Sequence, residues 1–421
     1  MAAARGAPRS RLGLGVILAL LGPGLVGAAA ARAETVMQLF VVELPASTPA
    51  EAPVWISGDL PALGSWNGAG VRLGPAGSGR CVARVALERG VPFEFKVTRG
   101  SWETVEKDAR GGEIANRRGR AGEHDTVLAV VAAWRDQTGS TPARRSTLTG
   151  EVRSHPRFPS SFVRPRDVLV WLPPGYDADS ARRYPVLYFH DGNNVLDAAT
   201  SFKGVEWGAD ETAERLIRAG ALRPFILVAV YNTSDRMAEY TPVSDERHGG
   251  GQAAGYERFL VEELKPFVDR SYRTLPGPGS TGLVGSSLGA IVSLDLGLQR
   301  PDLFGLVGCI SPAVWWGRRD IVRRVTAGKG AALRVWLDIG TAEGTEKAGT
   351  REWLDDARAL RAALRARGWR EDRDLHYEEV EGAVHDEGAW AARLDRVLVF
   401  LLGPPHPGAS GAVHRRDRRA G

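Results

Sequence analysis

The chain has 421 residues, more than one typical domain, and its hydrophobic fraction of 43% and charged fraction of 25% are ordinary for soluble globular proteins. The net charge of +5 comes from the two ends, because residues 1–33 carry four arginines and no acid, and residues 405–421 carry four arginines against one aspartate. The rest of the chain is close to neutral, so its charge indicates neither a nucleic-acid-binding protein nor one that binds anionic membranes.

The N-terminus has the three parts of a secretory signal peptide. Arginines precede an apolar run over residues 12–26, and Ala31–Ala33 is a small-x-small cleavage site, so we expect processing before Glu34. The alternative, a retained membrane anchor, is disfavoured because the run is short and interrupted by Gly and Pro. The mature protein is therefore expected to be secreted or periplasmic, without an integral membrane segment.

Residues 34–134 are predicted to form a small all-β sandwich, because short apolar runs are separated by turn-rich segments. The expected strands cover residues 38–42, 54–56, 71–73, 81–85, 93–97 and 127–131. The polar segment 135–147 is expected to be a linker.

Cys81 and Cys309 lie in different predicted domains, each within an apolar, strand-like run. This placement favours two buried thiols over one disulfide, which is the alternative. The sequence shows no Cys/His cluster with metal-ligand spacing, so we expect no metal site.

From residue 148 to residue 403, strand-like apolar runs alternate with amphipathic helical stretches. Continuous apolar runs suit strands that are buried on both faces of a mainly parallel sheet, so this part is predicted to be an α/β domain. The expected strands are 168–172, 185–189, 225–230, 282–284, 306–310, 335–339 and 375–380, and the expected helices include 256–268 and 353–364. Residues 404–421 form a basic tail rich in Pro, Gly and Ala, which is predicted to be disordered.

The apolar strand 282–284 runs directly into the motif Gly285-x-Ser287-x-Gly289 and then into a helix-compatible stretch. This is the sequence form of a nucleophile elbow, a tight strand-to-helix turn that exposes a serine. Ser287 is the predicted nucleophile, and the backbone N–H of Leu288 at the helix start is a predicted oxyanion donor. A Gly/Ser turn without chemistry is the alternative interpretation of the motif alone.

A serine nucleophile needs a base, and the base needs an orienting acid. In α/β-hydrolases the acid and then the histidine follow the serine along the chain. His385, in the loop after the predicted strand 375–380, is the expected base. Glu343, in the loop after the strand that ends at Ile339, is the expected acid, and Asp338 inside that strand is the alternative.

The second oxyanion donor is expected in the loop at residues 190–194, which follows an early strand. A turn that contains glycine can present backbone N–H groups to an oxyanion, so Gly192 or Asn193 is the predicted donor. An Asp-Gly turn without function is the alternative. Trp315 and Trp316 are expected either to line a substrate pocket or to pack in the core.

Residues 148–403 resemble the Putative esterase (esterase D-like) family of α/β-hydrolases, which includes feruloyl, acetylxylan and enterochelin esterases, S-formylglutathione hydrolases and mycolyltransferases. The matching stretches are 187–197, 231–242, 285–290 and 382–385. The resemblance implies an α/β-hydrolase fold, an ester substrate, no cofactor, and a triad at Ser287, Glu343 and His385. The family's acid is often Asp, so Glu343 departs from the common pattern.

The N-terminal domain resembles the family 20, starch-binding carbohydrate-binding modules. The matching stretches are 56–60, 63–67, 93–96, 101–103 and 116–117. By this resemblance Trp66, Lys96, Trp102 and Asn116 form one glucan site, in which the indoles stack on glucose rings and the polar groups bond hydroxyls. The alternative is a sandwich whose tryptophans only pack.

Together these features predict a secreted serine carboxylic-ester hydrolase that a starch-binding-like module holds on an α-glucan or a related polysaccharide. One alternative is an acyltransferase of the mycolyltransferase type, in which a sugar hydroxyl replaces water. The other is a starch-binding protein with an inactive hydrolase domain, which the presence of all three triad residue types in order disfavours. The acyl group and the alcohol of the ester are not indicated.

Overall fold

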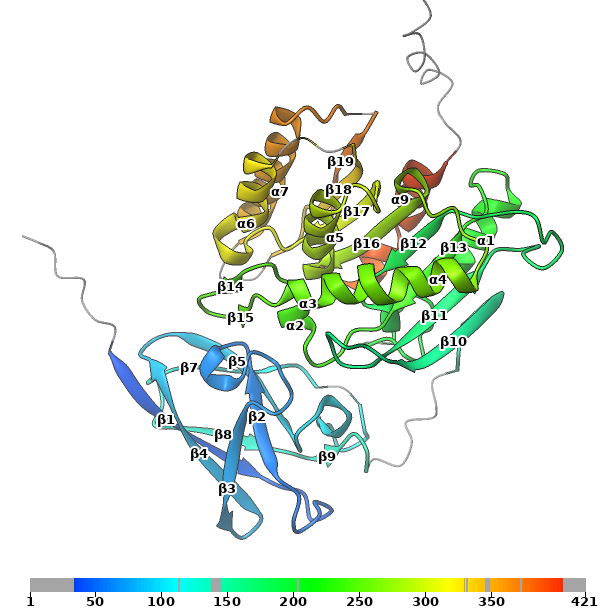
Figure 1. Ribbon diagram of the computed structural model, residues 1–421. Helices are drawn as coiled ribbons and strands as arrows, with labels where there is room; N and C mark the ends of the chain where they lie inside the picture. Colours follow the sequence, from blue (N-terminus) through cyan, green and yellow to red (C-terminus); the bar gives the residue numbers. More distant parts are fainter. Residues whose placement is uncertain are drawn as a thin grey trace, which may run out of the picture.

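The computed structural model describes residues 34–403, apart from 113, 138–144, 203, 329, 331, 345–348 and 372. The predicted signal peptide, the basic tail and the middle of the predicted linker therefore lie outside the described residues. Within the described part there are two large sheets. The first belongs to an all-β N-terminal part, and the second is flanked by helices (Figure 1). No helix in this part is long and apolar enough to cross a bilayer.

The N-terminal sheet has seven strands in the order β7-β5-β2-β3-β4-β1-β8. Its strands are β1 (Thr35–Glu43), β2 (Val54–Gly58), β3 (Val71–Gly77), β4 (Arg80–Glu88), β5 (Pro92–Thr98), β7 (Arg117–Arg120) and β8 (Thr126–Val130). A second, two-stranded sheet joins β6 (Glu106–Lys107) to β9 (Ala133–Trp134). Five of the six runs expected from the sequence lie within strands, and the sixth, 127–131, ends one residue beyond β8. Strands β6, β7 and β9 are short or polar and were not expected.

Strand β3 allows the N-terminal sheet to fold over itself. Its first half pairs with β2 and its second half pairs with β4. As a result, Phe40 of β1 packs against Phe93 and Phe95 of β5, with ring centroids 5.6 and 5.3 Å apart. The two halves share one core, which is the layered arrangement expected of a small sandwich.

The second sheet has eight strands in the order β10-β11-β13-β12-β16-β17-β18-β19. Strands β10 and β11 pair antiparallel, as do β11 and β13, and the remaining pairs are parallel. The strands are β10 (Glu151–Phe158), β11 (Arg166–Leu172), β12 (Val186–Phe189), β13 (Ile226–Val230), β16 (Thr281–Ser287), β17 (Leu306–Pro312), β18 (Arg334–Gly340) and β19 (Leu375–Val380). This mainly parallel sheet with its helices is the predicted α/β-hydrolase architecture.

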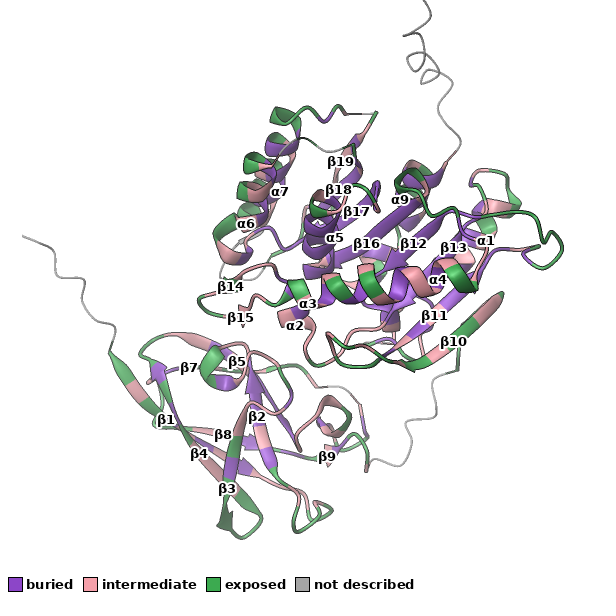
Figure 2. Cartoon of the chain, in the orientation of Figure 1, coloured by how far each residue is buried: buried purple, intermediate pink, exposed green. Residues whose placement is uncertain are grey.

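Helices cover both faces of this sheet, so its central strands are buried throughout (Figure 2). Successive side chains point to opposite faces, and Leu187 and Phe189 therefore join one core cluster while Val186 and Tyr188 join the other. The helices are α1 (Ala209–Arg218), α2 (Arg236–Glu239), α3 (Ala253–Arg258), α4 (Lys265–Ser271), α5 (Leu288–Gln299), α6 (Trp316–Ala327), α7 (Gly349–Ala366), α8 (Glu387–Ala391) and α9 (Leu394–Leu402), with a π-helical segment η4 (Phe259–Leu264) between α3 and α4.

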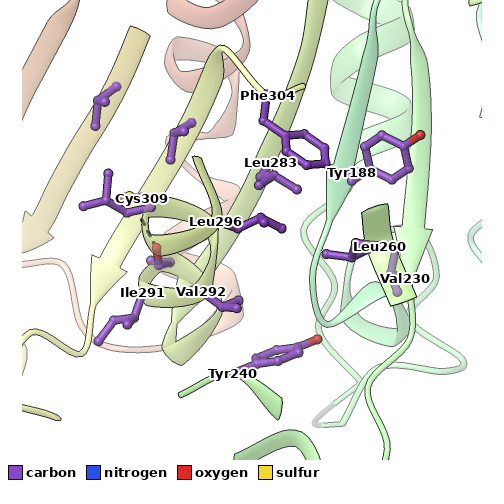
Figure 3. Packing of buried hydrophobic residues seen from close by; sticks show 14 of the residues in the cluster. Tyr188, Val230, Tyr240, Leu260, Leu283, Ile291, Val292, Leu296, Phe304 and Cys309 are labelled. Atoms are coloured by element: carbon purple, nitrogen blue, oxygen red, sulfur yellow. Dashed lines mark hydrogen bonds between the residues drawn. The ribbon is translucent and has the colours of Figure 1, made fainter. Parts of the chain in front are cut away.

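The larger core cluster lies between the sheet and helices α3 to α7. Figure 3 shows its packing, in which the rings of Tyr188 and Phe304 meet edge to face with centroids 6.2 Å apart. Leu283 of β16 and Leu296 of α5 belong to the same cluster. The nucleophile strand and its helix are thus held by the main core of the fold.

Both cysteines are free thiols, and one of them is less buried than predicted. Cys309 lies in β17, where its Sγ is 3.5 Å from the carbonyl oxygen of Ala290 and burial raises the pKa of the thiol. Cys81 is only partly buried, because it lies near the start of β4 and packs against the margin of the N-terminal core.

The short helix α2 is fixed by two ion pairs. Arg166 of β11 donates to both carboxylate oxygens of Glu239, at 2.9 and 2.6 Å, and both side chains are at most 5% exposed. Arg236 donates to both oxygens of Asp191, at 2.6 and 2.7 Å. These contacts connect α2 to the sheet and to the loop that follows β12.

We expect Glu239→Gln to destabilise the fold by about 3–5 kcal/mol, because it leaves the Arg166 guanidinium buried without its counter-charge. The double variant Arg166→Met with Glu239→Met removes both charges and should be clearly more stable than the single variant. Urea denaturation of the three proteins tests this. A single variant as stable as the wild type would contradict the prediction.

Candidate active site

Ser287 lies on a strained turn between β16 and α5. It is the last residue of the strand, and its backbone has φ 57° and ψ −120°, a region that costs a residue other than glycine about 1–3 kcal/mol. The turn needs Gly285, because a Cβ there would lie 2.5 Å from the backbone of Gly289. Leu288 is the first residue of α5, so its N–H has no acceptor within the helix. The geometry is that of a nucleophile elbow.

Glu343 and His385 contact each other directly. Glu343 follows β18 and His385 follows β19, and the Nδ1 atom of His385 lies 2.7 Å from Oε2 of Glu343. Because β16, β18 and β19 are parallel, their carboxyl ends lie at one edge of the sheet, together with Ser287. A carboxylate at Nδ1 favours the tautomer with its proton on Nδ1, which leaves Nε2 able to accept a proton.

The second oxygen of Glu343 is also bound. Oε1 accepts hydrogen bonds from the backbone N–H of Gly340 at 2.7 Å and from the hydroxyl of Ser311 at 2.5 Å. Burial by itself would raise the pKa of Glu343, but the hydrogen bond from His385 and these further donors lower it below its ordinary value. Glu343 is therefore ionised at neutral pH although it is only 1% exposed.

Asp338, the alternative acid, serves a different partner. It is buried, and its Oδ1 atom accepts from Nη2 of Arg393 and from the backbone N–H of Ser311, each at 3.0 Å. Its Oδ2 atom accepts from the indole of Trp336 at 2.6 Å. Arg393 lies farther from Glu343, at 3.5 Å, so Asp338 is its main counter-charge. The carboxylate in contact with His385 is Glu343.

Four residues near His385 were not predicted from the sequence. Ser311 and Arg393 complete the network behind Glu343, and Trp353 and Trp390 each pack edge-on against the imidazole with centroids 5.0 Å apart. Ser311 follows the apolar run of β17, which is a weak signal for a role near the site. A buried arginine such as Arg393 looks the same in sequence as a surface arginine.

The loop after β12 is shaped for close backbone approach. Asp191 has a left-handed backbone with φ 55°, and a Cβ on Gly192 would lie 2.5 Å from the carbonyl carbon of Ala229. Burial would raise the pKa of Asp191, but the guanidinium of Arg236 and the amide of Asn232 lower it. The anchored carboxylate holds the turn in which the predicted donors Gly192 and Asn193 lie.

Trp315 and Trp316 differ in their surroundings. Trp316 is 2% exposed, belongs to the main core, and its indole donates to the carbonyl of Val243 at 2.8 Å. Trp315 instead lines a cavity of about 380 Å³ with His248 and polar residues of the surrounding loops. The ring of Trp315 lies 6.5 Å from that of Trp353, which in turn contacts His385. Trp353 thus contacts both the ring of Trp315, which lines the cavity, and the base His385, which does not line it.

In the segments that follow β2 and β5, the rings of Trp66 and Trp102 are half-buried, with centroids 6.1 Å apart and planes inclined by 39°. The indole of Trp102 donates to the carbonyl of Trp66 at 3.2 Å. Asn116 is exposed and its amide donates to Glu94. Lys96 differs from the expected surface donor, because it is only 7% exposed and its ammonium group bonds the carbonyl oxygen of Ile114.

Comparison with known proteins identifies the second sheet and its helices. The family model described as "Putative esterase" matches residues 160–401. The chain belongs to this esterase family. It is 26% identical over 245 residues to the uncharacterized protein YbbA of Bacillus subtilis (strain 168), a match that spans 56% of this chain and 93% of YbbA. It is also 26% identical over 299 residues to the ferri-bacillibactin esterase BesA of the same organism, a match that covers 65% of this chain and 96% of BesA.

The N-terminal region of this esterase-family chain is similar to a different class of protein. It aligns with a segment of an alpha-amylase from Niallia circulans, with 40% identity over 101 residues. The match spans 23% of this chain and only 8% of the amylase. The similarity is consistent with a starch-binding module.

Substitution of the two candidate acids should separate their roles. We expect Glu343→Gln to lower kcat for ester hydrolysis about 10²- to 10⁴-fold, because the amide no longer fixes the tautomer of His385 or stabilises the imidazolium. Asp338→Asn should instead lower the free energy of unfolding, by about 1–3 kcal/mol, through its weaker contact with Arg393. Steady-state kinetics and urea denaturation of both variants test this. A larger loss of kcat in Asp338→Asn would contradict the assignment.

Proposed function

We propose that the protein is a serine esterase that hydrolyses carboxylic esters. The observation that carries the proposal is the strained elbow at Ser287 together with the 2.7 Å contact between His385 and Glu343 at the same edge of the sheet. A serine on such a turn is presented to a substrate, and a neutral imidazole oriented by a buried carboxylate is a competent base. Membership of the esterase family supports the same reaction class.

In the proposed mechanism, Ser287 Oγ attacks the ester carbonyl while Nε2 of His385 takes its proton. The backbone N–H of Leu288 and that of Gly192 or Asn193 stabilise the tetrahedral oxyanion. The intermediate collapses to an acyl-enzyme, and the leaving alcohol receives the proton from His385. Water, deprotonated by His385, then attacks the acyl-enzyme. As this second tetrahedral intermediate collapses, the carboxylic acid leaves and His385 returns the proton to Ser287 Oγ.

We propose that the acyl group carries an aromatic ring. The cavity beside Trp315 is large enough for a small acyl group, and the Trp353 ring lies between Trp315 and the base His385. Flat aromatic side chains bind planar rings through offset or edge contacts. A feruloyl or catechol-type acyl group would contact these rings over a larger area than acetyl would.

We further propose that the protein is exported and that its N-terminal sheet binds an α-glucan. Trp66 and Trp102 offer two partly exposed rings at 6.1 Å, and Asn116 lies at the surface. The similarity to an amylase segment supports this role. The module would hold the esterase on the polysaccharide rather than take part in the chemistry.

Replacing the nucleophile tests the reaction. Ser287→Ala should reduce hydrolysis of methyl ferulate and p-nitrophenyl acetate by at least about 10³-fold, since Ala offers no atom that can be acylated. Ser286→Ala, one residue earlier, is the matched control and should retain activity within a factor of about ten. Near-normal turnover by Ser287→Ala would rule out the proposed mechanism.

The glucan site can be tested without touching the catalytic part. The double variant Trp66→Ala with Trp102→Ala should lose retention on insoluble starch, because the two indole rings supply most of the contact area with a sugar. Its hydrolysis of a soluble ester should remain that of the wild type. Unchanged retention on starch would rule out this site.

A further inference from the structure

Three carboxylates gather where α1 begins, away from the triad. They belong to Glu206, Asp210 and Glu211, and one oxygen of each lies within 4.8 Å of the others. Asp210 is fully buried, and the other two are partly buried. Each of the three has one buried oxygen without a hydrogen-bond partner: Oε2 of Glu206, Oδ1 of Asp210 and Oε2 of Glu211.

This arrangement is costly unless something neutralises it. A buried carboxylate oxygen without a partner is strongly unfavourable, and three like charges at this distance repel each other. The amino end of α1 carries only about half of one positive charge, against up to three negative ones. Among the described residues, Thr147 and Thr149, which are both neutral, donate hydrogen bonds to Glu206 and Asp210 respectively. Buried unsatisfied groups that cluster in this way point to a bound ion.

We propose that Glu206, Asp210 and Glu211 form a binding site for a hard divalent cation, with Ca²⁺ as the favoured ion. All the donors are oxygens, which suits Ca²⁺ and Mg²⁺ and disfavours softer metals. Ca²⁺ takes six to eight oxygens in a flexible geometry, whereas Mg²⁺ usually keeps several waters and is bound through one or two carboxylates, so three largely buried carboxylates favour Ca²⁺. This site departs from the expectation of none, which rested on the absence of a Cys/His cluster, because a hard cation needs only oxygen ligands.

The site would stabilise the segment 147–149, which precedes β10. Oδ2 of Asp210 accepts from the backbone N–H and the hydroxyl of Thr149, at 2.6 and 3.0 Å. The hydroxyl of Thr147 bonds the carboxylate of Glu206. A cation held by the free oxygens would fix the same carboxylates that hold this segment. Its removal should therefore loosen the connection between the two sheets as well as the start of α1.

The first experiment uses the whole chain after dialysis against a chelator. Addition of 10 mM Ca²⁺, roughly 10 to 100 times the dissociation constants of extracellular calcium modules, should raise the melting temperature by a few degrees, and Mg²⁺ should raise it less. Tb³⁺ should bind in place of Ca²⁺ and luminesce on excitation of tryptophan, since Trp207 adjoins Glu206, and Ca²⁺ should displace it. No shift with Ca²⁺ and no displaceable Tb³⁺ signal would overturn the proposal.

Variants connect the response to this site. Asp210→Asn and Glu211→Gln should each lose the Ca²⁺-dependent shift and weaken Tb³⁺ binding at least about tenfold. Glu214→Gln, on the same helix with the same change of charge, should respond as the wild type does. A shift that persists in both site variants would place the ion elsewhere and overturn the proposal. A higher melting temperature in Asp210→Asn, with no ion response in the wild type, would show only a relieved carboxyl repulsion and would also overturn it.

Discussion

The backbone of Ser287 is the constraint on which the rest of the esterase fold depends. Its conformation, with φ 57° and ψ −120°, requires β16 and α5 to approach closely, and Gly285 and Gly289 permit that approach. The strain has to be offset by the surroundings, and here β16 is a central strand with buried neighbours on both sides. A rigid sheet that is covered by helices on both faces is therefore part of how the serine is presented.

A second constraint is the charge balance behind His385. Arg393, Asp338 and Glu343 are all buried within one network, and burying charges is tolerated only when they are paired. Arg393 lies closer to Asp338, at 3.0 Å, than to Glu343, at 3.5 Å. The negative charge of Glu343 therefore remains directed at the imidazole. The choice between two nearby acids is thus made by a cation that lies 50 residues beyond Glu343 in the chain.

The two sheets divide the work of the protein in our proposal. The esterase part holds the strained serine, the base and the aromatic wall, whereas the N-terminal sheet carries the paired tryptophans. The segment before β10 contacts Glu206 and Asp210. An ion at these carboxylates and Glu211 would therefore stabilise this segment and would not take part in catalysis. Stability and catalysis can then respond to different conditions.

The sequence alone determined the elements whose signal is local. Continuous apolar runs predicted the buried strands, and the short Gly-x-Ser-x-Gly stretch predicted the turn at Ser287, because both depend on neighbouring residues. The edge strands β7 and β10 were missed, since half-exposed strands need few apolar residues. Only the tertiary structure decided that Glu343, and not Asp338, contacts His385. It also decided that the side chains of Arg393 and Lys96 are buried. Those outcomes depend on which distant residues meet, and burial and charge pairing between distant residues leave no pattern along the chain.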